Sequence, residues 1–399
     1  MNQYSQPTTI EQFTQIVRDM YNNKDGRTPD FKKEFDAAVL YVQPIPPTEG
    51  NPQGRNPWAG ADVDYLCKFF EQWYDWNPAL ETGLDKIQEF AWLYYNPAKV
   101  PENHGLNFVK NSGFIMTQFF VVLNGQYKMD RPVSKPLADK WMHALGKQMD
   151  DYIIPKYGYT TFNEFFIREL KPGKRPVSGV NDDSVVACPA DAVVNMIDDK
   201  ISVDAPINTK TQKNLRLSVR QLLDQSPLAD EFEDGTAVSC ILMPNVYHRY
   251  HSPVSGKVID AKADVAGDYF GIDDFPKLIN GGNVGYGYDY SVFEHFRRGY
   301  LIIETDKFGY VAMIPVGLNT IASVIFSNKK LDPAKHELPQ EIYKGEEIGY
   351  FQYGGSLNIL LFQKGVFPAV RIPQGQIIGT MNEKPAKEEE QPHVSQFVI

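Results

Sequence analysis

The sequence has few cysteines, no excess of positive charge and no long apolar run. Its three cysteines, Cys67, Cys188 and Cys240, are far apart and form no CxxC pair, so they indicate neither a disulfide framework nor a zinc site. The formal net charge of −10 argues against the basic surface of a nucleic-acid-binding protein. The most apolar short run, residues 114–123, is too short and too polar to span a bilayer. We therefore expect no nucleic-acid partner and no membrane contact.

The composition is that of an ordinary globular protein, with 42% hydrophobic, 13% aromatic and 23% charged residues. The first ten residues are polar and lack the charged-then-apolar order of a secretory signal. A length of 399 residues is enough for two or three domains with a sizeable core. These features predict a soluble, cytoplasmic protein.

The N-terminal part of the chain is predicted to be helical. Residues 1–60 mix proline, glycine and asparagine with short helical pieces and predict a loosely structured arm. Residues 61–155 carry apolar side chains at spacings of three and four, for example Phe69, Phe70 and Trp73, and predict a helical domain. Its many tryptophans and tyrosines are interpreted as core residues.

The C-terminal part changes to β-branched runs separated by glycine, proline and aspartate, a pattern typical of an antiparallel sheet or sandwich. A β domain is therefore predicted over residues 156–382, with one helix at 219–224. Residues 383–399 predict a charged, solvated tail. The predicted fold class is α+β, an N-terminal helical domain followed by a mostly antiparallel β domain. The runs begin near residues 184, 191, 237, 257, 300, 309 and 321.

A serine that follows two glycines interrupts one strand pattern near the C-terminus. Gly354, Gly355 and Ser356 lie between apolar runs, and glycine inside a strand marks a bulge or a close backbone approach. By itself the Gly-Gly-Ser sequence most simply indicates a tight turn between two strands. The alternative is a backbone held in a special conformation, with a hydroxyl beside an accessible carbonyl.

Two histidines and one acid supply further candidates for chemistry. His248 and His251 are three residues apart, and an imidazole can accept and return a proton near neutral pH. No third and fourth metal ligand accompanies them, so no metal site is predicted. Asp191 begins an apolar strand, where it is either a turn residue or an acid that orients a histidine. The glycines at 281–285 lack the context of a nucleotide-binding loop.

Several motifs in order resemble those of the phosphatidylserine decarboxylase family of pyruvoyl enzymes. Residues 161–176, TFNEFFIRELKPGKRP, resemble the FFxRxLKPGxRP signature, and CPADAVV at 188–194 resembles PADGxV, with Ala192 where glycine is usual. YHRYHSPVSGKV at 247–258 resembles YHxxHxPxxG. KGEEIGYFQYGGS at 344–356 resembles the stretch at which that family cleaves itself.

The resemblance implies a self-cleaving proenzyme. Asp191 would hold His251, which would accept the proton of Ser356 as that hydroxyl attacks the carbonyl of Gly355. Cleavage between residues 355 and 356 would convert Ser356 into a pyruvoyl group, which supplies the electron sink that pyridoxal phosphate supplies in other decarboxylases. No metal and no pyridoxal phosphate would be needed. His248 would contact the substrate carboxylate or return a proton.

The substrate is expected to be a free amino acid, because the helical residues 1–155 resemble the extension of the soluble branch that includes fungal L-tryptophan decarboxylase. An aromatic, tryptophan-like substrate is favoured, with Tyr269 and Phe270 as candidates for its side-chain pocket or for core packing. The alternatives are a phosphatidylserine decarboxylase and a non-catalytic relative that does not cleave itself. A homodimer is compatible with this interpretation.

Overall fold

The computed structural model of the protein describes most of the chain, and every structural statement below concerns those residues. Among the predicted site residues, Gly355, Tyr269 and Phe270 lie outside them, as does the charged tail. The described ranges are 6–24, 26, 28–45, 47, 51–77, 85–94, 104–204, 218–243, 245–265, 297–317, 324–332, 336–353, 356–367, 369–372 and 374–375.

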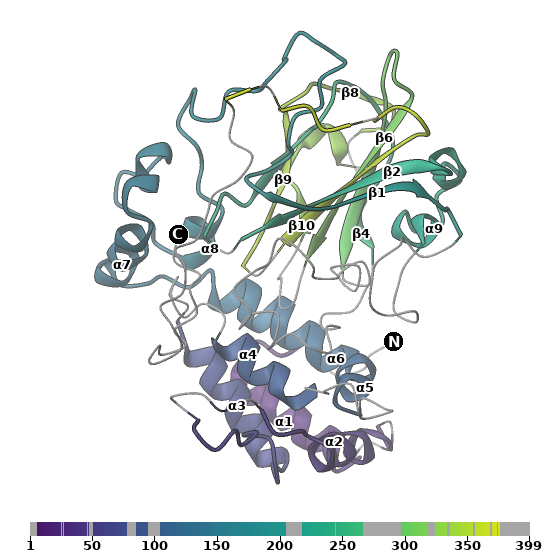
Figure 1. Ribbon diagram of the computed structural model, residues 1–399. Coiled ribbons are helices and arrows are strands. Elements are labelled where there is room, and N and C mark those ends of the chain that lie inside the picture. Colours follow the sequence, from purple (N-terminus) through teal and green to yellow (C-terminus); the bar gives the residue numbers. More distant parts are fainter. Residues whose placement is uncertain are drawn as a thin grey trace.

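The helices lie mainly before residue 167 and gather below the sheets in Figure 1. The described part of the region 61–155 contains helices, as its apolar spacing predicts; the helix that begins at Lys135 ends at Leu145, where Gly146 has a φ of 54°, and a separate 3₁₀ helix follows. The helices are α1 (Ile10–Tyr21), α2 (Phe31–Leu40), α3 (Val63–Asp75), α4 (Asp85–Ala91), η1 (Trp92–Tyr94), α5 (His104–Asn111), α6 (Gly113–Met116), the π-helix η2 (Thr117–Lys128), α7 (Lys135–Leu145), η3 (Gly146–Asp151), α8 (Phe162–Phe166), α9 (Val219–Leu222), η4 (Ala229–Phe232) and η6 (Lys329–Leu331).

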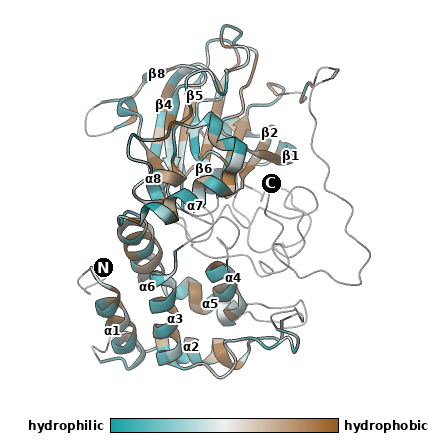
Figure 2. Cartoon of the chain, turned by 90° about the vertical axis from the view of Figure 1, so that its left-hand side faces the viewer, coloured by the Kyte–Doolittle hydropathy of each residue, from teal (hydrophilic) through white to brown (hydrophobic). Residues whose placement is uncertain are grey.

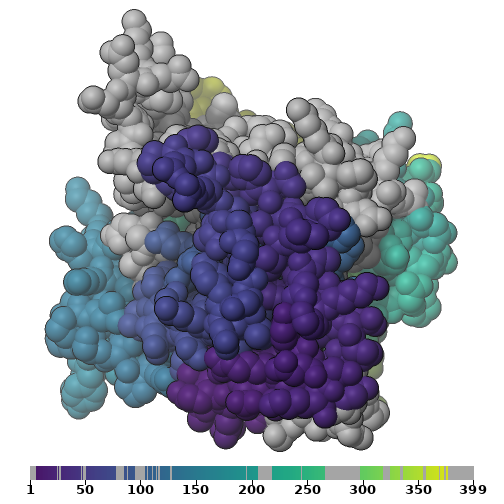
Figure 3. All heavy atoms as spheres, turned by 90° about the horizontal axis from the view of Figure 1, so that it is seen from below, coloured from purple at the N-terminus to yellow at the C-terminus, as the bar shows by residue number. Residues whose placement is uncertain are grey.

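Helices α1 and α2 lie in the region where we expected a loosely structured arm with short helical pieces. Thr9 caps α1 by accepting a hydrogen bond from the backbone N–H of Gln12. Phe13 and Val17 on one face of α1 are fully buried and join the same hydrophobic core as α2 and α3. These helices therefore form part of the helical layer, and seen from below they cover much of that face of the molecule (Figure 3).

The strands form two antiparallel sheets, as the alternating runs predict. The larger sheet has seven strands in the order β1-β2-β10-β6-β5-β4-β8, and the smaller has three in the order β3-β9-β7. Apolar residues concentrate on the strands of the larger sheet (Figure 2). The strands are β1 (Val193–Ile201), β2 (Gly235–Leu242), β3 (Arg249–His251), β4 (Gly256–Val265), β5 (Arg298–Glu304), β6 (Tyr310–Gly317), β7 (Val324–Phe326), β8 (Gln340–Ile342), β9 (Glu347–Phe351) and β10 (Ser356–Phe362).

Strand β10 lies near the middle of the larger sheet, between β2 and β6, and all of its side chains are buried. Because successive side chains of a strand point to opposite faces, β10 contributes to two cores. Leu357, Ile359 and Leu361 pack with the N-terminal helices. Leu360 and Phe362 pack on the other side, with residues of the smaller sheet. The molecule therefore has three layers, which are helices, the seven-stranded sheet and the three-stranded sheet.

One expected strand is absent from the described residues. Residues 184–189, read as a β-branched run, form turns and extended backbone without a sheet partner. Instead, Ala187 N–H donates to the carbonyl of Pro253 at 2.9 Å, and His251 N–H donates to the carbonyl of Pro189 at 2.8 Å. Two prolines in these segments cannot donate ladder hydrogen bonds, so the pairing stays too short for a strand. The same bonds bring the acid motif beside the histidine motif.

Candidate active site

Ser356 is the first residue of β10 and lies where three strands meet. It is opposite Leu242, the last residue of β2, and Gly317, the last residue of β6. Its side chain is fully buried, and its hydroxyl has no hydrogen-bond partner among the described residues. Burying a hydroxyl without a hydrogen-bond partner costs folding free energy. Packing alone therefore does not explain a serine at this position.

The histidine segment begins where β2 ends, beside Ser356. Arg168, which follows α8, fixes this segment because its Nη2 donates to the carbonyls of Asn245 at 2.6 Å and Val246 at 2.8 Å. The guanidinium also lies 4.3 Å from the ring centroid of Tyr152 and is almost fully buried. One terminal NH2 group of a guanidinium carries two donors, so it can hold two adjacent carbonyls in this way. The path of the chain into the two histidines is therefore set from α8.

His248 is fully buried and stacks on Phe166, with the ring centroids 3.8 Å apart. Neither ring nitrogen has a hydrogen-bond partner of ordinary geometry among the described residues. Burial lowers the pKa of His248 well below 6.5, and the charge of Arg168 lowers it further, while the nearby Val246 carbonyl opposes both only in part. His248 is therefore a neutral imidazole at physiological pH.

His251, on β3, has a partner at each ring nitrogen. Nδ1 is 2.9 Å from the carbonyl of Gly345, and Nε2 is 2.9 Å from the hydroxyl of Tyr247. Because a carbonyl only accepts, Nδ1 carries the proton and Nε2 accepts the O–H of Tyr247. Burial lowers the pKa of His251, although the Gly345 carbonyl and the charges of Glu347 and Asp191 oppose that effect. This imidazole is also neutral, and its basic nitrogen faces Tyr247.

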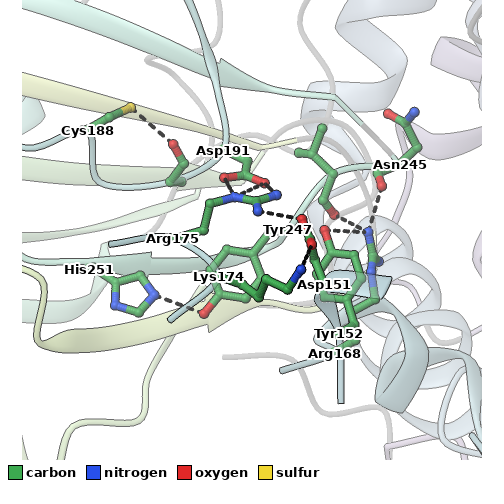
Figure 4. Close-up of polar contacts among 12 residues, drawn as sticks. Asp151, Tyr152, Arg168, Lys174, Arg175, Cys188, Asp191, Asn245, Tyr247 and His251 are labelled. Atoms are coloured by element: carbon green, nitrogen blue, oxygen red, sulfur yellow. Dashed lines mark hydrogen bonds and ion pairs between the residues drawn. The ribbon is translucent and has the colours of Figure 1, made fainter. Parts of the chain in front are cut away.

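The expected hydrogen bond between Asp191 and His251 is not formed in this structure. Asp191 is instead bound by Arg175, whose Nε is 3.0 Å from Oδ1 and whose Nη2 is 2.9 Å from Oδ2 (Figure 4). Arg175 also donates to Asp151 at 2.7 Å, and Asp191 raises the pKa of Arg175. Both nitrogens of His251 are already occupied, so Asp191 acts on this ring only through its charge. The prediction that Asp191 holds His251 directly is therefore wrong for this state of the chain.

Several residues near the site had no role assigned from the sequence. Asn163 on α8 accepts the N–H of Tyr353 at 3.3 Å through Oδ1 and donates to the carbonyl of Gly125 at 2.9 Å through Nδ2. Tyr247 and Phe166 are the partners of the two histidines. Asn358 is a carboxamide in an otherwise apolar strand, which is the signal that could have identified it.

Within the described part of the chain, no group of three or more histidine, cysteine, aspartate or glutamate side chains is arranged to hold a metal ion. None of the helices described is long and apolar enough to cross a bilayer. The site thus consists of a serine without a partner, two neutral imidazoles and a network of ion pairs around Asp191. These groups suit proton transfer and attack by a hydroxyl, the chemistry of a chain that processes itself.

Comparison with known proteins agrees with this class. Residues 162–384 match the family described as phosphatidylserine decarboxylase. A phosphatidylserine decarboxylase proenzyme of Fusobacterium nucleatum is 30% identical over 272 residues, which cover 68% of this chain and 80% of that protein. Proenzymes numbered 2 from rice and from Komagataella phaffii are 30% and 32% identical over 59% of this chain, but the match spans only 35% and 21% of their own lengths.

The chain belongs to the phosphatidylserine decarboxylase family, which is a family of carboxy-lyases. The match starts at α8 and includes both sheets, so the helices before it lie outside the region that defines the family. The resemblance to the tryptophan decarboxylase branch has no counterpart among these relatives.

Proposed function

We propose that the chain is a self-processing, pyruvoyl-dependent decarboxylase that acts on phosphatidylserine and yields phosphatidylethanolamine and carbon dioxide. The observation that carries the proposal is Ser356, a fully buried hydroxyl without a described partner at the start of β10, an interior strand of the larger sheet. The names of the relatives support the lipid substrate over the free aromatic amino acid that the helical region suggests.

The pyruvoyl group would be made from Ser356 itself, so this residue decides whether the site can hold the group. During processing, the hydroxyl of Ser356 would attack the preceding carbonyl, and the peptide bond would become an ester. Elimination of the ester would free a carboxylate at the end of the first chain, and one water molecule would release the former backbone nitrogen as ammonia. The group would then supply an electron sink when substrate is bound.

The protein's own residues would handle protons and orientation. His251 remains our candidate to accept the proton of Ser356, for which its Nε2 would first release the hydroxyl of Tyr247, with its charge favoured by Asp191 through space. His248 would contact the substrate carboxylate or return a proton to the product carbon. A neutral, buried imidazole suits that role because it can accept or donate without first giving up a competing partner.

The experiment begins with a denaturing gel and intact mass of freshly purified protein. We expect two fragments, the smaller one starting with an α-keto acyl group at residue 356, and a single full-length chain for Ser356→Ala. Carbon dioxide release is then measured from phosphatidylserine vesicles and, separately, from tryptophan, phenylalanine and tyrosine. A full-length chain that still decarboxylates would contradict the proposed chemistry. Carbon dioxide from the amino acids alone would overturn the lipid substrate and leave self-processing intact.

The second candidate is decarboxylation of a free aromatic amino acid. It is supported by the helical layer before residue 162, which packs against the larger sheet in one continuous core and lies outside the family match. Both candidate substrates are α-amino carboxylates, so the chemistry required of the site is the same for each. A non-catalytic relative, the third possibility, predicts a single band for the wild-type chain.

A further inference from the structure

A second unpartnered polar side chain lies on the same strand as Ser356. Asn358 is fully buried, and neither its amide nitrogen nor its amide oxygen has a hydrogen-bond partner among the described residues. The rest of β10 beyond Ser356 is leucine, isoleucine and phenylalanine. Burying an unsatisfied carboxamide costs free energy that an apolar side chain would avoid, so packing does not explain this residue.

Asn358 and Ser356 share one face of the strand. Side chains two residues apart point the same way, and Leu360 and Phe362 place that face toward the smaller sheet. Asn358 is opposite Cys240 on β2 and Pro315 on β6. The side chains of Cys240 and Pro315 carry no strong donor or acceptor that could serve the amide.

The spacing along the strand indicates what the amide can reach. Two residues of antiparallel strand rise about 7 Å, which is too far for a direct hydrogen bond between the serine hydroxyl and the asparagine amide in their present positions. A group that extends a few atoms beyond residue 356 would bring its polar atoms to the amide. In both candidate substrates, the carboxylate lies next to the carbon that bears the amine, so it is within that range.

We propose that Asn358 is a substrate-binding residue whose Nδ2–H donates a hydrogen bond to the α-carboxylate of the substrate held at residue 356. The proposal rests on the proposed function, because it requires residue 356 to hold an amino-acid-type substrate. It holds for phosphatidylserine and for a free aromatic amino acid alike, since they share this carboxylate. Asn358 therefore selects substrate over product, which has the amine but lacks the carboxylate.

The test replaces the amide with a side chain of similar branching. We expect Asn358→Leu to cleave itself as the wild type does, to raise KM for the carboxylate substrate by about tenfold to a hundredfold, and to leave the inhibition constant of the product amine unchanged. The pairs are phosphatidylserine with phosphatidylethanolamine, and tryptophan with tryptamine. Whichever pair the wild type uses identifies the source of the carboxylate.

Thermal unfolding provides a readout that does not depend on turnover. Because leucine removes an unsatisfied buried amide, Asn358→Leu should unfold at a temperature about 2 °C or more above the wild type. The matched control is Asn124→Leu on η2, another fully buried carboxamide whose nitrogen and oxygen have no described partner. We expect that control to gain stability without a change in KM.

An unchanged KM in cleaved Asn358→Leu would overturn the proposal, as would an equal loss of affinity for substrate and product. A lower unfolding temperature for Asn358→Leu would show that the amide has a structural role and would also overturn it. If the wild-type chain neither cleaves itself nor releases carbon dioxide, the proposed function fails, and that outcome is visible before any Asn358 variant is made.

Discussion

The ring of Phe166 lies 3.8 Å, centroid to centroid, from the imidazole of His248, with the two planes 24° apart. Phe166 ends α8, and Arg168 two residues later holds the carbonyls of Asn245 and Val246, which precede the histidine. One short helix thus fixes both the face of the imidazole and the backbone that carries it. The basic and aromatic residues of the FFxRxL motif have a physical role in positioning the site.

The first prediction concerns the hydrogen bonds from Arg168 to the carbonyls of Asn245 and Val246. Arg168→Lys keeps a positive charge but loses the guanidinium, whose Nη2 directs its two N–H donors at the two carbonyls. We expect unfolding free energy to fall by about 2 kcal/mol, because two partly buried carbonyls lose their donors, and self-cleavage to slow at least tenfold. Urea unfolding and a time course on a denaturing gel measure the two effects. Arg131→Lys, at a largely exposed arginine, is the control, and cleavage at the wild-type rate in Arg168→Lys would contradict the positioning role.

The second prediction concerns Asn163, which joins α8 to the segment just before Ser356. Asn163→Asp keeps an oxygen that can accept the N–H of Tyr353, but it loses the donor that serves the carbonyl of Gly125 and the carboxylate of Asp130, and it places a second acid beside Asp130. Asn163→Leu loses both. We therefore expect cleavage to be slowest in the leucine variant and intermediate in the aspartate variant, with the same order in unfolding free energy. Equal cleavage rates in both variants would show that the bond to Tyr353 does not position the serine.

Much of this site could be predicted from sequence because its residues come in short, spaced motifs. The α+β class followed from helical spacing before residue 155 and β-branched runs after it, and the motif around Ser356 placed the serine at a break in a strand. Helix α1 was also predictable, because Ile10, Phe13, Val17 and Met20 repeat at helical spacing. The glycines and prolines of the surrounding sequence suggested a loosely structured arm instead.

The hydrogen-bond partners of the site residues could not be predicted. Side-chain hydrogen bonds depend on distances in the folded chain, and the spacing of residues along the sequence does not determine these distances. Asp191 was paired with His251 by analogy with a triad, whereas the fold places Arg175 beside the acid and Tyr247 beside the ring. The prediction also missed Asn358, although one carboxamide among leucines is visible in the sequence. Its lack of partners is apparent only from packing.

The third prediction concerns acid stability. His248 has a folded-state pKa well below 6.5, so between that pKa and 6.5 the unfolded chain binds a proton that the folded chain does not. The free energy of unfolding is therefore not reduced by this histidine above pH 6.5. Below pH 6.5 it falls by up to about 1.4 kcal/mol per pH unit, because the unfolded chain is stabilised by the proton that it binds. His251, whose pKa is also lowered, adds to the same slope.

Urea unfolding of the uncleaved Ser356→Ala chain between pH 5 and 7.5 measures this slope. In that background, His248→Phe should remove the part of the pH dependence that comes from the one proton which the unfolded imidazole binds and the folded one does not. An identical slope with and without His248 would mean that its ring is protonated as readily in the folded chain as in the unfolded one.

The last prediction separates the two histidines. His251 has a fixed tautomer, with Nδ1–H donating to Gly345 and Nε2 accepting from Tyr247, and Asp191 favours its charged form. We therefore expect His251→Ala to remain a single band on a denaturing gel. His248→Ala should still cleave, because the charge of Arg168 disfavours the protonated ring that a base at His248 would become, but its turnover should fall at least a hundredfold. Tyr247→Phe leaves Nε2 without its donor and should alter the pH dependence of cleavage in particular. If His248→Ala blocks cleavage while His251→Ala permits it, the unpartnered ring is the base that acts on Ser356, and the two roles must be exchanged.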